Sequence, residues 1–167
     1  EDQESTKIYA DGCIINQPVN FYSNWRAEND LNAYFIENDI PCLYGIDTRY
    51  LTKKLSEEGA KKAALVHFGE DKESIKIVQN QINNWSGLEN LDLAKVVSTS
   101  NIYTWDKGIW SNNKKNNNLN RFRVTCLDFG IKQNILRNLY GINLDPTVLN
   151  LSASLSDIID TKPDGIF

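Results

Sequence analysis

The residues in this chain with the greatest capacity for chemistry are its three cysteines, Cys13, Cys42 and Cys126. A catalytic thiol needs a nearby base and a sharp GxCxG turn that presents the sulfur, and none of the three has glycines in that pattern. No two are spaced as CxxC, so the sequence indicates neither a zinc knuckle nor a disulfide framework. We expect three reduced, intracellular thiols, each a small buried apolar side chain, with Cys126 inside a strand.

Two further features bear on chemistry. The single histidine, His67, lies in an apolar run without partners at metal-ligand or catalytic spacing, so we expect a structural or surface role. Asp128, Phe129 and Gly130 spell the metal-binding tripeptide of protein kinases, but the chain has no HRD-type loop and no glycine-rich loop. GxGxxG and Walker A sequences are also missing, so the sequence provides no phosphate cradle.

Lys132 follows this tripeptide at the point where a helix is expected to begin. The positive end of a helix dipole disfavours a cation, so the position suggests a role for Lys132 outside the helix, although a solvated lysine would also explain it. On residue chemistry alone the sequence contains no complete active site, and we assign it no metal ion and no cofactor.

Hydrophobic spacing predicts a mixture of short elements in the first part of the chain. We expect helices over residues 28–38, from the cap Asp47 to Gly59, and around 75–82 with Asp71 as the cap. Short strands are expected at residues 44–46 and 63–68.

The last third of the chain alternates strand and helix. We expect a strand at residues 122–127, a turn at 128–130, and a helix that carries Ile131, Ile135 and Leu139 and ends at Gly141. A weaker strand at 144–149, interrupted by Asp145 and Pro146, a short helix at 156–160 and a strand from 165 follow. This order predicts a parallel sheet with right-handed crossovers. Only its first half is present, and that half is not expected to be stable alone.

Composition sets further bounds. The 167 residues include 18 basic and 22 acidic side chains, a net charge of −4. Because an acidic chain does not attract the phosphates of a nucleic acid, we expect no nucleic-acid partner. No apolar run is long enough to cross a membrane. Residues 111–120 read SNNKKNNNLN, which predicts a linker between a first unit and a second. The acidic start and the absence of Met suggest an internal segment of a longer protein.

Three longer blocks read GIDTRYLTKKLSEEGA at 45–60, GLENLDLAKVVSTSNIYTW at 87–105 and LDFGIKQNILRNL at 127–139, with PDGIF closing the chain. In this order and spacing they resemble the small, glutamine-hydrolysing chain of carbamoyl phosphate synthase. The resemblance runs from about residue 5 to residue 167. Residues 24–26 and 38–49 are most similar to the cyanobacterial and plastid branch. Together with the Asn- and Lys-rich composition, this similarity implies a plastid-encoded protein of the chloroplast stroma, or otherwise a cytoplasmic one.

The resemblance implies an α/β fold: a small N-terminal α/β domain (1–110), a linker (111–120) and the first half of a doubly wound class I glutamine amidotransferase domain (121–167). In this family a Cys–His–Glu triad hydrolyses L-glutamine, and ammonia passes through a tunnel to the large chain. There, ATP and Mg serve the formation of carbamoyl phosphate for arginine and pyrimidine biosynthesis. The implied partners are therefore the large subunit and glutamine, with no cofactor in this chain.

The resemblance carries over one candidate residue and no catalytic group. The triad is expected beyond Phe167, whereas Lys132 matches a lysine that the family places near the ammonia exit. Ala63 departs from the family, which usually has Gly there. The alternative function is a non-catalytic docking module of the same fold that binds a synthetase subunit.

Overall fold

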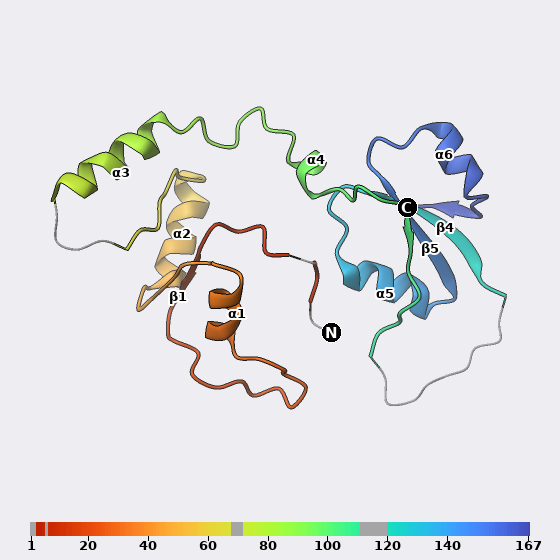
Figure 1. The fold of residues 1–167 in the computed structure, drawn as a ribbon, viewed down its shortest axis with the longest axis horizontal. Helices are drawn as coiled ribbons and strands as arrows, with labels where there is room; N and C mark the ends of the chain where they lie inside the picture. Colours follow the sequence, from red (N-terminus) through yellow and green to blue (C-terminus); the bar gives the residue numbers. More distant parts are fainter. Residues whose placement is uncertain (1–2, 6, 68–71, 111–119) are drawn as a thin grey trace. The chain divides into compact units, whose positions relative to one another are not determined.

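The computed structural model of the chain describes residues 3–5, 7–67, 72–110 and 120–167 (Figure 1). These residues form two compact units. The first unit comprises residues 8–89, and the second, called here the sheet unit, comprises residues 1–7 and 90–167. The chain therefore passes from the first unit to the sheet unit between residues 89 and 90, whereas the sequence predicted this boundary at 111–120. Most of that expected linker, 111–119, lies outside the described residues.

The first unit is built around a short parallel strand pair. Strands β1 (Cys13–Ile15) and β2 (Cys42–Tyr44) place Cys13 opposite Cys42 and Ile15 opposite Tyr44. Helix α1 (Leu31–Glu37) begins where Asp30 Oδ1 accepts a hydrogen bond of 2.8 Å from the Ala33 amide. A side-chain oxygen at this position satisfies an amide that the helix itself leaves unpaired.

Helices α2 (Thr48–Glu58) and α3 (Lys72–Asn84) complete the first unit and confirm the helices expected there. Asp47 caps α2 through the Tyr50 amide at 2.9 Å, and Gly59 ends it with a φ of +79°. The left-handed region suits glycine, which has no Cβ to clash. The expected cap of α3, Asp71, lies outside the described residues.

Two strand assignments in this unit need correction. The strand expected at 44–46 is β2, two residues earlier, because its ladder with β1 starts at Cys42. The strand expected at 63–68 is wrong for 63–67, which have no regular structure, and Phe68 is outside the described residues. Of residues 61–67 only Leu65 is half-buried, beside Gly12, and within the described part of the chain no strand pairs with this segment. An apolar run without a partner strand cannot form a ladder.

The sheet unit contains a four-stranded sheet in the order β3-β5-β4-β6. β4 (Phe122–Asp128) lies between β5 (Leu144–Asn150) and β6 (Gly165–Ile166) and is parallel to both. α5 (Gln133–Gly141) leads to β5 on one side, and α6 (Leu155–Asp160) leads to β6 on the other. Figure 1 draws the two helices on opposite sides of these strands. This arrangement is the start of a doubly wound sheet, as the sequence predicted.

The edge strand β3 (Tyr103–Thr104) explains why the boundary between the units differs from the expected one. It pairs antiparallel with β5, with Tyr103 opposite Val148. Tyr103 and the following Trp105 pack against the buried core of the sheet unit. Residues 90–110, which include the short helix α4 (Leu93–Val97), therefore belong with the sheet.

The core of the sheet unit lies between the strands and α5. Cys126, Leu136 and Val148 are fully buried, and Val124 joins their cluster. Pro146 fits inside β5 because its carbonyl accepts the Trp105 amide at 2.9 Å, beyond the last residue of β3. The ring nitrogen of Pro146 therefore faces the short edge strand, where a missing donor costs little.

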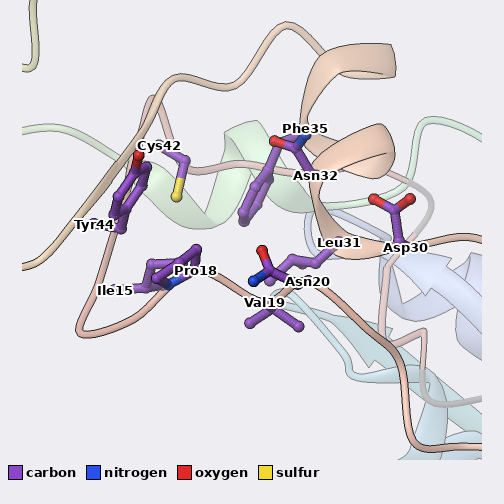
Figure 2. A pocket seen from close by; sticks show the side chains of 10 residues that line it. All are labelled: Ile15, Pro18, Val19, Asn20, Asp30, Leu31, Asn32, Phe35, Cys42 and Tyr44. Carbon is purple, nitrogen blue, oxygen red and sulfur yellow. The ribbon is translucent and has the colours of Figure 1, made fainter.

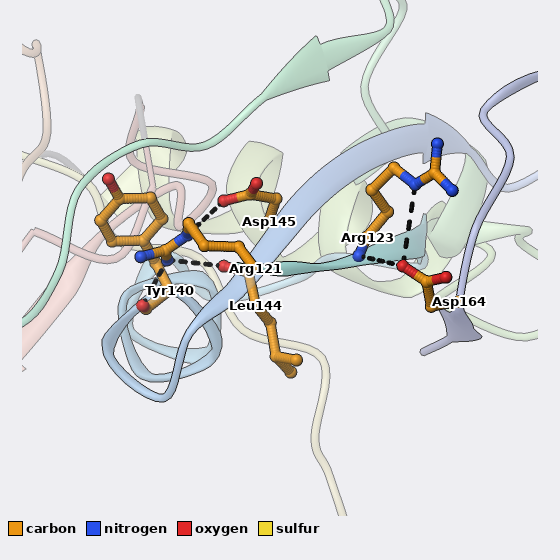
Figure 3. A network of polar contacts seen from close by, with 6 residues as sticks. All are labelled: Arg121, Arg123, Tyr140, Leu144, Asp145 and Asp164. Atoms are coloured by element: carbon orange, nitrogen blue, oxygen red, sulfur yellow. Dashed lines mark hydrogen bonds and ion pairs between the residues drawn. The ribbon is translucent and has the colours of Figure 1, made fainter. Parts of the chain in front are cut away.

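Two arginines hold the start of β4 (Figure 3). Arg121 lies 3.7 Å from the Tyr140 ring centre, donates to the Tyr140 and Leu144 carbonyls, and pairs with Asp145. Its side chain is only 18% exposed. Arg123 reaches Asp164 across 3.7 Å, but its side chain is 55% exposed. Arg121 therefore ties α5 and β5 to β4, while the Arg123 pair lies at the surface.

Candidate functional site at the carboxyl end of strand β4

The loop after β4 is organised by a buried carboxylate. Asp128 is 5% exposed. Its Oδ1 accepts from the amides of Gly130 at 2.9 Å and Ile131 at 2.8 Å, and its Oδ2 accepts from the Thr99 amide at 2.7 Å. With its oxygens bonded to backbone amides, Asp128 fixes the turn and ties it to residues 98–101. The kinase-like tripeptide thus has a structural role for its aspartate.

Gly130 is required by this turn for two independent reasons. Its φ is +100°, a conformation that side-chain-bearing residues rarely adopt. A Cβ built on it would also lie 2.9 Å from Val97 Cγ2 on helix α4. The turn therefore brings the backbone close to α4 and directs the chain into α5.

Lys132 is at the N-cap of α5, one residue before the helix, as the sequence predicted. It makes no side-chain capping bond, and its side chain is exposed. The cap is supplied instead by Glu4, whose carbonyl accepts from the Gln133 amide at 3.2 Å and whose Oε2 accepts from the Asn134 amide at 2.9 Å. A carboxylate at the positive helix end offsets the unfavourable placement of the lysine.

Arg137, one turn further along α5, holds the same N-terminal segment. Its Nη2 donates to the Gln3 carbonyl at 2.9 Å and to Gln133 Oε1 at 3.1 Å, and its guanidinium lies 5.8 Å from the Trp105 ring. The residue is 8% exposed. Residues 3–4 are thus fastened to α5 at two points, a contact that no local sequence pattern indicates.

An apolar cavity of about 330 Å³ opens beside this turn. Phe129, Ile166 and Phe167 contribute to its wall and are each more than half exposed. Parallel α/β sheets bind ligands outside the carboxyl ends of their strands, where the strand order reverses. Since β5 and β6 flank β4 on opposite sides, that point is the end of β4, next to Lys132.

A second cavity, of about 440 Å³, lies in the first unit between α1 and the strand pair (Figure 2). Its wall includes Phe35, Cys42 and Tyr44, with Asp30 at its rim. The Asp30 carboxylate already caps α1. This cavity is a groove of mixed polar and apolar lining, and its wall contains no acid–base pair.

The thiols and the histidine do not meet at either cavity as a catalytic set. Cys126 is fully buried in the sheet, and this burial raises the pKa of its thiol to about 11. The thiolate, which is the nucleophile, is thereby disfavoured, in agreement with the expected core role. His67 is exposed in the first unit. Within the described ranges, no three His, Cys, Asp or Glu side chains gather as metal ligands, and no helix could span a bilayer.

The fold and this edge define the class as α/β, with a mixed sheet whose parallel strands wind in both directions from β4 and whose edge strand β3 is antiparallel. Residues 1–65 match the family model "Carbamoyl-phosphate synthase small chain, CPSase domain". Proteins named carbamoyl phosphate synthase small chain align over nearly the whole chain, so the chain is similar to this family along its length. The protein from Zymomonas mobilis is 35% identical over 100% of the chain and 46% of its own length.

Two other relatives give the same picture. The proteins of that name from Buchnera aphidicola (of Acyrthosiphon pisum) and Brucella anthropi are each 38% identical, over 99% and 93% of the chain. The chain spans 44% and 39% of these relatives. All three organisms are bacteria, so the plastid location expected from residues 24–26 and 38–49 together with the composition has no support from them.

Proposed function

We propose that this chain is part of the glutamine-hydrolysing subunit of carbamoyl phosphate synthase and contributes the start of its amidotransferase sheet. The observation that carries the proposal is the alignment of 93–100% of the chain with proteins of that name. The expected partners are L-glutamine and the large subunit. That subunit would hold the ATP and Mg that supply the phosphoryl chemistry, and the product would serve arginine and pyrimidine synthesis.

In this proposal the groups that attack glutamine lie outside the chain, beyond Phe167. The placement of Cys126 supports this, because a fully buried thiol with a raised pKa is a poor nucleophile. Expressed alone, the 167 residues should therefore release no glutamate from glutamine. Glutaminase activity that disappeared in a Cys126→Ser variant would refute this assignment.

Lys132 is proposed to act in the transfer of ammonia rather than in its release. Its exposed side chain lies near the carboxyl end of β4, where such sheets bind ligands. Glu4, and not Lys132, caps helix α5. In the complete enzyme, Lys132→Ala should leave glutamine hydrolysis largely intact but lower the carbamoyl phosphate formed per glutamate released. Lys107, also exposed in the sheet unit, provides the control Lys107→Ala. An unchanged ratio for Lys132→Ala would leave this lysine without a role in transfer.

The alternative is a docking module that binds a synthetase subunit without catalysis. The two candidates differ in how the complete enzyme uses its nitrogen source. With a glutaminase subunit, the complete enzyme can take the nitrogen of carbamoyl phosphate from glutamine. With a docking module, free ammonia is the only nitrogen source. Measuring carbamoyl phosphate formation with each source in turn separates the two.

A further inference from the structure

The register of the first unit brings two cysteines together. Cys13 on β1 and Cys42 on β2 are directly opposite in a parallel ladder, although 28 residues separate them in the sequence. Neighbouring strands are about 4.8 Å apart, within the Cα separations at which disulfides form. Because opposite residues of a parallel pair point to the same face, the two thiols share one side of the sheet.

The pKa of Cys42 reflects the neighbouring cysteine. Burial raises the pKa of the Cys42 thiol, and the neighbouring Cys13 raises it further through charge repulsion and a side-chain hydrogen bond. Both cysteines are half-buried and free. These effects agree with the register, which places Cys13 directly opposite Cys42.

The pair is also accessible. Figure 2 shows the Cys42 thiol pointing into the groove between Tyr44 and Phe35. Ile15, opposite Tyr44 in the ladder, lines the same groove, so Cys13 shares its face of the sheet. A small reagent in this groove of about 440 Å³ can therefore reach Cys42 from solvent, with Cys13 as its neighbour on the same face.

We propose that Cys13 and Cys42 form a redox-active dithiol that low-molecular-weight disulfides oxidise to a disulfide joining β1 to β2. One cysteine loses its proton to solvent and attacks a sulfur of the small disulfide, releasing one small thiol and forming a mixed disulfide. The second cysteine, deprotonated in turn, attacks the protein sulfur of that mixed disulfide and expels the other small thiol. Two protein thiols are oxidised, and one small disulfide is reduced to two thiols.

The bond would close a loop over residues 14–41, which include all of α1. It would therefore fasten the strand pair under the helix and change the wall of the groove. Cys126 is the internal control, because it is fully buried in the other unit and has no cysteine beside it.

The test treats protein containing the whole 167-residue chain with oxidised glutathione, blocks remaining thiols and digests with trypsin. Cys13, Cys42 and Cys126 then lie on separate peptides, at residues 8–26, 27–49 and 124–132. Mass spectrometry should find 8–26 linked to 27–49, with peptide 124–132 carrying only the blocking group. Reduction with dithiothreitol should abolish the link.

Single variants show whether the second thiol resolves the first. In Cys42→Ser and in Cys13→Ser the remaining cysteine should keep a glutathione adduct, whereas wild type should accumulate none. Oxidised wild type should also melt at a higher temperature than reduced protein, with no such shift in either variant. A stable adduct on wild-type Cys13 or Cys42, the absence of linked peptides, or faster modification of Cys126 would each overturn the proposal.

Discussion

Replacing Gly130 with alanine should destabilise the sheet unit by about 3 kcal/mol, from two separable causes. Placing an L-residue at a φ of +100° costs roughly 1–2 kcal/mol. The new Cβ would lie 2.9 Å from Val97 Cγ2, and such overpacking adds roughly 1–3 kcal/mol. Both costs fall on the turn that leads from β4 into α5.

Hydrogen exchange of the β4 amides measures this loss of stability locally, because these amides exchange only when the sheet unfolds. A cost of about 3 kcal/mol speeds their exchange roughly 100-fold when opening is global. The matched control is Gly141→Ala at the end of α5, where a Cβ meets nothing within 4 Å and φ is not positive. Control and wild type should exchange at rates within a few-fold of each other.

A double mutant divides the two causes. Val97→Ala removes the methyl group that the new Cβ would meet but leaves the backbone conformation unchanged. Val97→Ala with Gly130→Ala should therefore recover about 1 kcal/mol relative to the sum of the single changes. If Gly130→Ala exchanges as slowly as Gly141→Ala, the argument from φ and from the contact with Val97 is wrong.

Arg121→Ala should lower the free energy of unfolding by about 2–3 kcal/mol in urea denaturation, because it removes charged hydrogen bonds to two carbonyls and the Asp145 pair. The exposed Arg123→Ala should cost less than about 1 kcal/mol, and equal losses would contradict the difference in burial. The raised pKa of Cys126, about 11 against the ordinary 9.0, means that the unfolded thiol ionises first. Stability should therefore be lost as pH rises from 9 towards 11, more in wild type than in Cys126→Ala, and parallel profiles would refute this. Residues 121–167 expressed alone should show no cooperative thermal transition, because they lack β3, Tyr103 and Trp105, whereas residues 90–167 should retain more structure.

Local signals in the sequence were sufficient for most elements. Asp47 and Gly59 delimit α2 as capping rules predict, since a cap depends on residues within one turn. The turn at Asp128 and the helix after it follow the same logic. By contrast, the apolar run at 63–67 has strand-like composition but no partner, and a strand exists only through pairing that local composition cannot reveal.

The candidate site separates in the same way into local and distant parts. The sequence identified the turn and placed Lys132 at the start of α5, because spacing alone defines a strand–turn–helix. The groups that complete the edge come from far along the chain: Glu4 caps the helix from 130 positions away, and Thr99 binds Asp128 across 29. Both are ordinary surface-type residues in the sequence; Glu4 lies outside the three family-like blocks, and Thr99 lies within the block at 87–105, which gives no local sign of this contact. Because Glu4 caps α5, the exposed Lys132 side chain is not used for capping at the strand edge, and the role in ammonia transfer that we propose for it depends on an N-terminal segment that the turn sequence does not specify.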